Sequence, residues 1–123
     1  MQPRKRLYLI DMINAADAVI EFTAGQTQDS FVANDMLRTA VQKKREIIGE
    51  AARALPDELK ARYPEVPWRQ MVGMRHISVH QYFSLDWDLI WETAVNHVTV
   101  DRAKLFRILS TEFPEEEWPL ISR

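Results

Sequence analysis

Apolar residues recur every three or four positions along most of this 123-residue chain, which is the spacing of one face of an α-helix. The first such segment predicts a helix over residues 4–23, and Gly25 follows as its stop. A short helical turn is expected next, with Asp29 and Ser30 as its candidate caps.

A longer apolar periodicity begins after Asp35 and continues until Pro56, which cannot extend a helix. This segment predicts the second main helix. Residues 57–63 predict a short helix. Residues 68–82 keep the helical period and predict a third main helix. Pro67 is compatible with its start, because proline is tolerated at or near the first turn of a helix.

Asp86 is the expected cap of a fourth helix, with Leu89, Ile90 and Ala94 as its core residues, and residues 100–113 predict a fifth helix or a bent continuation. No alternating run of strand length, no repeat and only three glycines are present. We therefore predict an all-α fold, an antiparallel bundle of four to five main helices.

Composition places this bundle in a single domain over residues 1–113, followed by a short acidic tail, 114–123, with Trp118 packed back. The absence of cysteine excludes disulfides, cysteine nucleophiles and thiolate zinc sites. No apolar run resembles a signal peptide or reaches transmembrane length, so we expect a cytoplasmic protein that does not associate with membranes.

The formal net charge of −2 disfavours non-specific binding of the whole protein to nucleic acid. Residues 38–75 nevertheless carry an excess of basic side chains, including Lys43, Lys44 and Arg45. These three are candidate contacts to RNA phosphates, and a solvated helix face is the alternative.

The main candidate functional residues are Arg75, His80 and Tyr82. A guanidinium matches phosphate, and an imidazole titrates near neutral pH, so the first two residue types suit phosphodiester chemistry. On an unbroken helix they would lie about 140° apart, so a shared site requires either unwinding near Ser78 or a two-fold dimer. Arg75, Ser78 and Tyr82 would share one face of that helix.

Structural roles compete with these functional ones. Arg75 can pair with a neighbouring helix, and the Tyr82 hydroxyl can bond one. Glu46 and Glu50 lie four residues apart and either orient the Arg and His or form a solvated face. His76 and His80 have metal-compatible spacing, but Ile77 occupies the place of a zinc protease's catalytic Glu, and we expect neither metal nor cofactor.

The surrounding motifs strongly resemble the HepT-like toxins of the HEPN ribonuclease superfamily. The matching stretches run in order over residues 47–52, 55–56, 62–69 and 73–83, followed by Asp86 and Ile90-Trp91. The family signature, Arg, four residues, His, one residue, Tyr, falls on Arg75, His80 and Tyr82. His76 fills the polar position that usually follows the Arg.

The resemblance implies a homodimer that gathers the Arg and His of both chains in one cleft and cuts RNA without metal. It also implies a cognate nucleotidyltransferase antitoxin of the MntA type, which adenylylates the motif tyrosine, here Tyr82. One departure is that Lys43 and Arg45 stand where relatives often have Arg and Leu, which puts a charge near a packing surface. A non-catalytic helical module that docks the nucleotidyltransferase is the alternative function.

Overall fold

The computed structural model describes residues 3–114, and every regular element in that part is helical. Four longer helices are α1 (Pro3–Thr23), α3 (Asp35–Ala54), α7 (Trp87–Asn96) and α8 (Val98–Glu112). Four short ones are α2 (Gln28–Ala33), α4 (Asp57–Arg62), α5 (Trp68–Val72) and α6 (Val79–Tyr82). The predicted all-α class is confirmed. The predicted acidic tail and Trp118 lie almost wholly outside the described residues.

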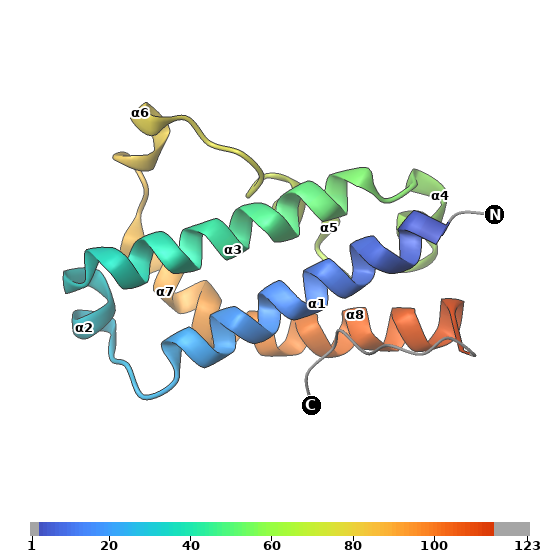
Figure 1. Cartoon of the computed structure of the whole chain (residues 1–123), viewed down its shortest axis with the longest axis horizontal. Helices are drawn as coiled ribbons and strands as arrows, with labels where there is room; N and C mark the ends of the chain where they lie inside the picture. Colours follow the sequence, from blue (N-terminus) through green and yellow to red (C-terminus); the bar gives the residue numbers. More distant parts are fainter. Residues whose placement is uncertain (1–2, 115–123) are drawn as a thin grey trace.

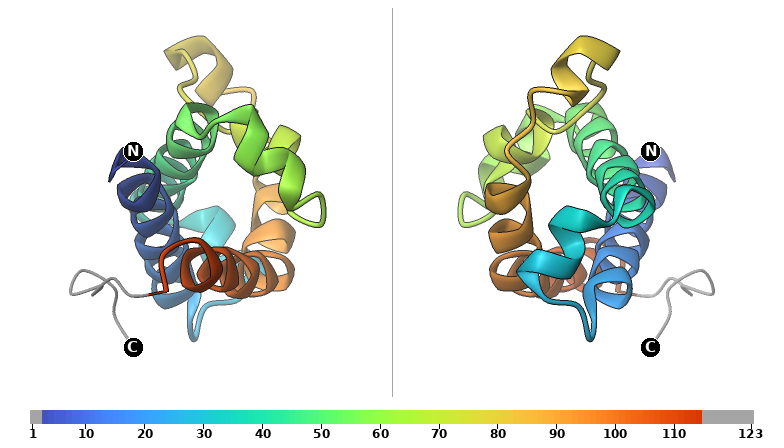
Figure 2. Two further views of the ribbon diagram at one scale, coloured as in Figure 1. Left: turned by 90° about the vertical axis from the view of Figure 1, so that its right-hand side faces the viewer. Right: turned by 90° about the vertical axis from the view of Figure 1, so that its left-hand side faces the viewer.

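Helix α1 lies at the centre of the packing and contacts both α3 and α8 along much of its length. Figure 1 shows that α3 and α8 both run antiparallel to α1. Helices α7 and α8 meet at His97, whose backbone is itself helical, so together they form the bent continuation that the sequence suggested. The end views in Figure 2 show these helices around a common interior, from which α6 stands apart.

The interior is apolar and continuous along α1. One cluster joins α1 to α3 and α8 through Met12, Ile13, Ile48 and Leu109. A second surrounds the fully buried Phe31 and includes Val19, Val41, Ile90 and Ala94. Ile90 and Ala94 are therefore core residues as predicted, whereas Leu89 is 58% exposed and the prediction that it is core was wrong.

The cap of α2 differs from the predicted ones, whereas that of α7 does not. Thr27 caps α2 by accepting a hydrogen bond from the Ser30 amide, so Ser30 is the reciprocal partner rather than the cap. Asn34 caps α3, with its side-chain oxygen accepting from the Leu37 amide. Asp86 caps α7 as predicted, with its carboxylate accepting from the Leu89 amide at 3.1 Å. Gly25, at φ +76°, follows the end of α1 as expected.

The predicted third main helix is broken. Helix α5 ends at Val72, and α6 begins only at Val79. Ser78 starts the new helix, because its hydroxyl accepts a hydrogen bond from the Gln81 amide while the Gln81 side chain accepts one from the Ser78 amide. The prediction that Arg75, Ser78 and Tyr82 share one helix face was therefore wrong, and the unwinding considered near Ser78 extends over residues 73–78.

No helix within the described range 3–114 is both long enough and apolar enough to cross a membrane.

Candidate functional site

The backbone at Arg75 is pressed against α3. A Cβ atom placed on Gly49 of α3 would lie 2.4 Å from the Arg75 amide nitrogen and 2.7 Å from the Met71 carbonyl oxygen. Only a residue without a side chain permits this approach. The Arg75 amide also bonds the Val72 carbonyl at 3.1 Å, while its guanidinium is exposed. Packing therefore fixes the Arg75 backbone and leaves its side chain in solvent.

His80 lies in α6, the four-residue helix that stands off from the rest of the molecule (Figure 1). Its imidazole is exposed and has no hydrogen-bond or ion-pair partner among the described residues. Two apolar neighbours are also exposed, Val79 in α6 at 75% and Phe83, which follows the helix, at 80%. The segment thus presents an imidazole close to exposed apolar side chains.

Tyr82 anchors α6 to the body of the protein. Its hydroxyl lies 2.8 Å from the Thr39 hydroxyl on α3, and its ring packs edge-on against Trp87 of α7 with the ring centroids 5.4 Å apart. The side chain is half-buried. The structural role proposed for this tyrosine, a hydrogen bond to a neighbouring helix, is therefore confirmed.

Arg75 and His80 do not meet through any direct interaction within the described chain. Neither side chain forms a hydrogen bond or ion pair there, either with the other or with Glu46 or Glu50. The competing role for Arg75, an ion pair with a neighbouring helix, is also not seen in that part of the protein. Both groups are thus available to a substrate or to a second chain.

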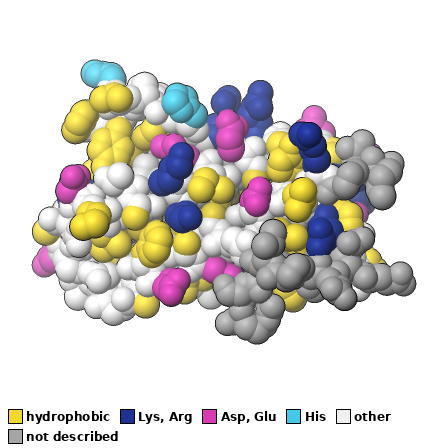
Figure 3. All heavy atoms as spheres, in the orientation of Figure 1, with side chains coloured by type: hydrophobic (Ala, Val, Ile, Leu, Met, Phe, Trp, Pro, Cys, Tyr) yellow, Lys and Arg dark blue, Asp and Glu magenta, His cyan; other side chains and the backbone are white. Residues whose placement is uncertain are grey.

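His76 is the motif residue that lies with carboxylates. A cavity of about 580 Å³ is bordered by His76 together with Lys43, Glu46 and Glu50 of α3. Tyr8 and Asp11 of α1 and Arg53 of α3 complete the polar lining. Figure 3 shows two exposed histidine side chains along the upper edge of this view, one near basic and acidic groups and the other, at the upper left, beside hydrophobic ones.

Asp11 and Arg53 are members of this cluster that the sequence did not single out. Burial raises the pKa of the Asp11 carboxyl above its usual value. Its only sequence signal was its position as a polar residue between apolar ones in the first helix. Within residues 3–114 no three His, Asp or Glu side chains are grouped as metal ligands would be.

The three basic residues of α3 do not form one surface. Lys43 lines the cavity beside His76, whereas Arg45 lines a different cavity on the other side of the helix. Neighbouring residues on a helix point about 100° apart, which separates them. Lys43 and Arg45 therefore point to different sides of α3, and a contact of Lys43, Lys44 and Arg45 with RNA phosphates stays a prediction.

These features define a class: an all-helical protein that displays Arg75, His80 and Tyr82 on a segment outside its helical core. A family model described as Ribonuclease HepT-like matches residues 12–112, so the chain belongs to the HepT-like ribonuclease family. The resemblance drawn from the motifs is confirmed.

Individual relatives agree with the family model. The chain is 41% identical to "Putative RNase MJ1380" of Methanocaldococcus jannaschii over 71% of this chain and 80% of that protein. It is 32% identical to "Putative RNase MJ0127" of the same organism, over 94% of this chain and 97% of the relative. "Probable ribonuclease HepT" of Thermococcus cleftensis is 33% identical over 82% and 92%, respectively. No solved structure shows a significant match.

Proposed function

We propose that this protein is a metal-independent endoribonuclease toxin whose active site forms where two copies meet. The observation that carries the proposal is that Arg75 and His80 are both exposed and unpaired in the described structure, although the sequence preserves the family's spacing between them. Membership of the HepT-like family and relatives named as RNases support the reaction class.

The proposed chemistry uses imidazole as base and acid. One His80 removes the proton from a ribose 2′-hydroxyl, whose oxygen attacks the adjacent phosphorus and forms a 2′,3′-cyclic phosphate. The bond from phosphorus to the 5′-oxygen breaks, and a second His80 protonates that oxygen. Arg75 stabilises the extra negative charge on the phosphate oxygens in the transition state.

Two copies are needed because one chain supplies only one His80. Helix α6 is suited to such a contact, since Val79 and Phe83 are exposed on it and Met36 of α3 is 79% exposed. Burying such apolar side chains between two copies would stabilise a dimer. In a two-fold dimer each chain contributes the same groups to the shared cleft.

Mixing the parent protein with His80→Ala tests the shared site. A dimer containing one chain of each keeps both Arg75 side chains but only one His80, so it lacks either the base or the acid. We expect an equal mixture, refolded together, to cleave a labelled RNA at about a quarter of the rate of the same total amount of parent protein, because about a quarter of the dimers contain two parent chains. Cleavage should be unchanged by a chelator. A rate of about half, which independent chains would give, would show that the shared site is wrong.

We further propose that a cognate nucleotidyltransferase of the MntA type inactivates the toxin by adenylylating Tyr82. The hydroxyl that would be modified is the group bonded to Thr39. Adenylylation removes its hydrogen and attaches a bulky anionic group to its oxygen, so we expect the contact between α6 and α3 to weaken. Loss of the α6 anchor would displace His80, which lies two residues earlier.

Intact mass measures this modification directly. The parent protein, co-expressed with the partner, is expected to gain adenylyl groups, whereas Tyr82→Phe is not, because it lacks the acceptor oxygen. Tyr82→Phe loses one partly exposed hydrogen bond, worth about 1 kcal/mol, and should stay folded. Tyr8→Phe is the control and should be modified like the parent. Equal masses for parent and Tyr82→Phe would remove the proposed regulation.

A further inference from the structure

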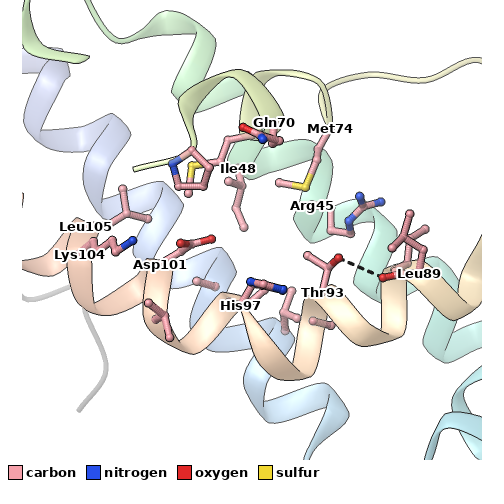
Figure 4. Close-up of a pocket in the computed structure, with 18 of the residues that line it drawn as sticks. Arg45, Ile48, Gln70, Met74, Leu89, Thr93, His97, Asp101, Lys104 and Leu105 are labelled. Atoms are coloured by element: carbon pink, nitrogen blue, oxygen red, sulfur yellow. Dashed lines mark hydrogen bonds between the residues drawn. The ribbon is translucent and has the colours of Figure 1, made fainter. Parts of the chain in front are cut away.

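A second cavity, of about 570 Å³, lies away from α6 between α3, α5, α7 and α8. Figure 4 shows its walls, where side chains of α3 and the α5 segment face those of α7 and α8. The lining is mainly apolar and includes Ile48, Met71, Met74, Ile90 and Leu105. Leu89 and Val100 line it yet are 58% and 52% exposed, so the cavity opens to solvent beside them.

Arg45 projects into this apolar space from α3 (Figure 4). Its guanidinium donates a hydrogen bond to the side-chain oxygen of Gln42, a neutral amide that is itself buried. No carboxylate forms an ion pair with Arg45 in the described part of the chain. Burial lowers the pKa of the guanidinium, and the nearby charge of Glu46 opposes that effect only in part. A desolvated cation without a counter-ion is costly, and a bound anion would remove that cost.

The opposite end of the cavity is polar. His97, Asp101 and Lys104 line it there, and Figure 4 shows Asp101 and Lys104 far from Arg45 along the cavity. Lys104 is already engaged, because its ammonium donates to the Glu65 carbonyl at 2.9 Å. The cavity thus has a cation at one end, apolar walls between, and hydrogen-bonding groups at the other.

We infer that this cavity binds a small organic anion, with its carboxylate or phosphate on Arg45 and its apolar body along Ile48 and Met71. A volume of about 570 Å³ is within the range of small-molecule sites, and apolar walls with a few polar groups are typical of them. Guanidinium binds both carboxylate and phosphate in a bidentate way. The proposal is independent of the ribonuclease site, since Arg75 and His80 do not line this cavity.

Calorimetric titration of the purified protein with two probes distinguishes the possible sources of the anion. Octanoate supplies an aliphatic carboxylate, and adenosine 5′-monophosphate supplies a nucleotide phosphate. We expect at least one to bind the parent protein with millimolar or better affinity. Arg45→Met should weaken it about tenfold or more, because a hydrogen-bonded charge pair is lost while the chain length is kept. Lys44→Met, which removes the adjacent charge but does not line the cavity, should bind like the parent.

A cavity-filling variant and a neutral ligand serve as further controls for this test. Thr93→Phe fills the cavity without changing a charge, so it should also abolish binding while Arg45 remains. Octanamide, the neutral analogue of octanoate, should bind the parent no better than octanoate binds Arg45→Met. The proposal is overturned if the parent binds neither anion, or if either Arg45→Met or Thr93→Phe binds as the parent does.

Discussion

Replacing His80 with alanine is expected to reduce RNA cleavage by ~10²–10⁴-fold, the usual contribution of a positioned general acid or base. In the proposed site the substitution removes the base and the acid at once, because both copies carry it. The imidazole is exposed and has no partner among the described residues, so its loss should change the free energy of unfolding by about 0.5 kcal/mol or less. A large fall in activity without a change in stability would therefore identify a chemical role.

His97→Ala is the matched control for this variant. His97 is an exposed histidine at the junction of α7 and α8 and lines the cavity that contains Arg45 rather than the motif segment. It should cleave RNA at the parent rate. Cleavage should be followed by sequencing the RNA ends produced by each protein. If His80→Ala produces the parent's ends at the parent's rate, the assignment of His80 is wrong.

The helical framework was predictable because apolar periodicity and caps are local signals. Helix α1 begins one residue before the predicted start and ends at the predicted Thr23. Asp86 caps α7 because its carboxylate accepts a hydrogen bond from a backbone amide in the first turn of the helix that follows it, and such a contact depends only on neighbouring residues. For α2, the predicted caps Asp29 and Ser30 and the observed cap Thr27 are all good caps by residue type, so residue type alone does not choose among them.

The break between α5 and α6 was not predictable in the same way. Residues 68–82 keep a helical apolar period, and Gly73 alone does not end a helix. What decides the path is the contact of Arg75 with Gly49, which lies 26 positions earlier on another helix. The cavity that His76 lines together with Glu46 and Glu50, and the cavity around Arg45, likewise depend on segments that meet only in the folded chain. The sequence could name these residues but not which of them would lie together.

The contact at Gly49 leads to the second large expected effect. By helix propensity alone, alanine in the middle of α3 should raise the free energy of unfolding by about 1 kcal/mol relative to glycine. Steric contact opposes this, because the new Cβ would lie 2.4 Å from the Arg75 nitrogen and 2.8 Å from its Cα. Both are backbone atoms that cannot rotate away, so the segment carrying Arg75 must move. We expect a net loss of about 1–3 kcal/mol in the free energy of unfolding for Gly49→Ala, as is usual for overpacking.

RNA cleavage by Gly49→Ala should also fall, by up to about 10²-fold, because displacing a transition-state group by about 1 Å can cost that much in rate. Gly73→Ala is the matched control. Its Cβ would lie 3.3 Å from the Gln70 carbonyl oxygen and 3.5 Å from that of Arg69, contacts that a small shift relieves. Thermal unfolding and RNA cleavage of the two variants measure the difference. A Gly49→Ala protein that is more stable than the parent and equally active would show that the close approach of Arg75 to α3 does not hold in solution. The backbone at Arg75 would then not be fixed as the proposed site requires.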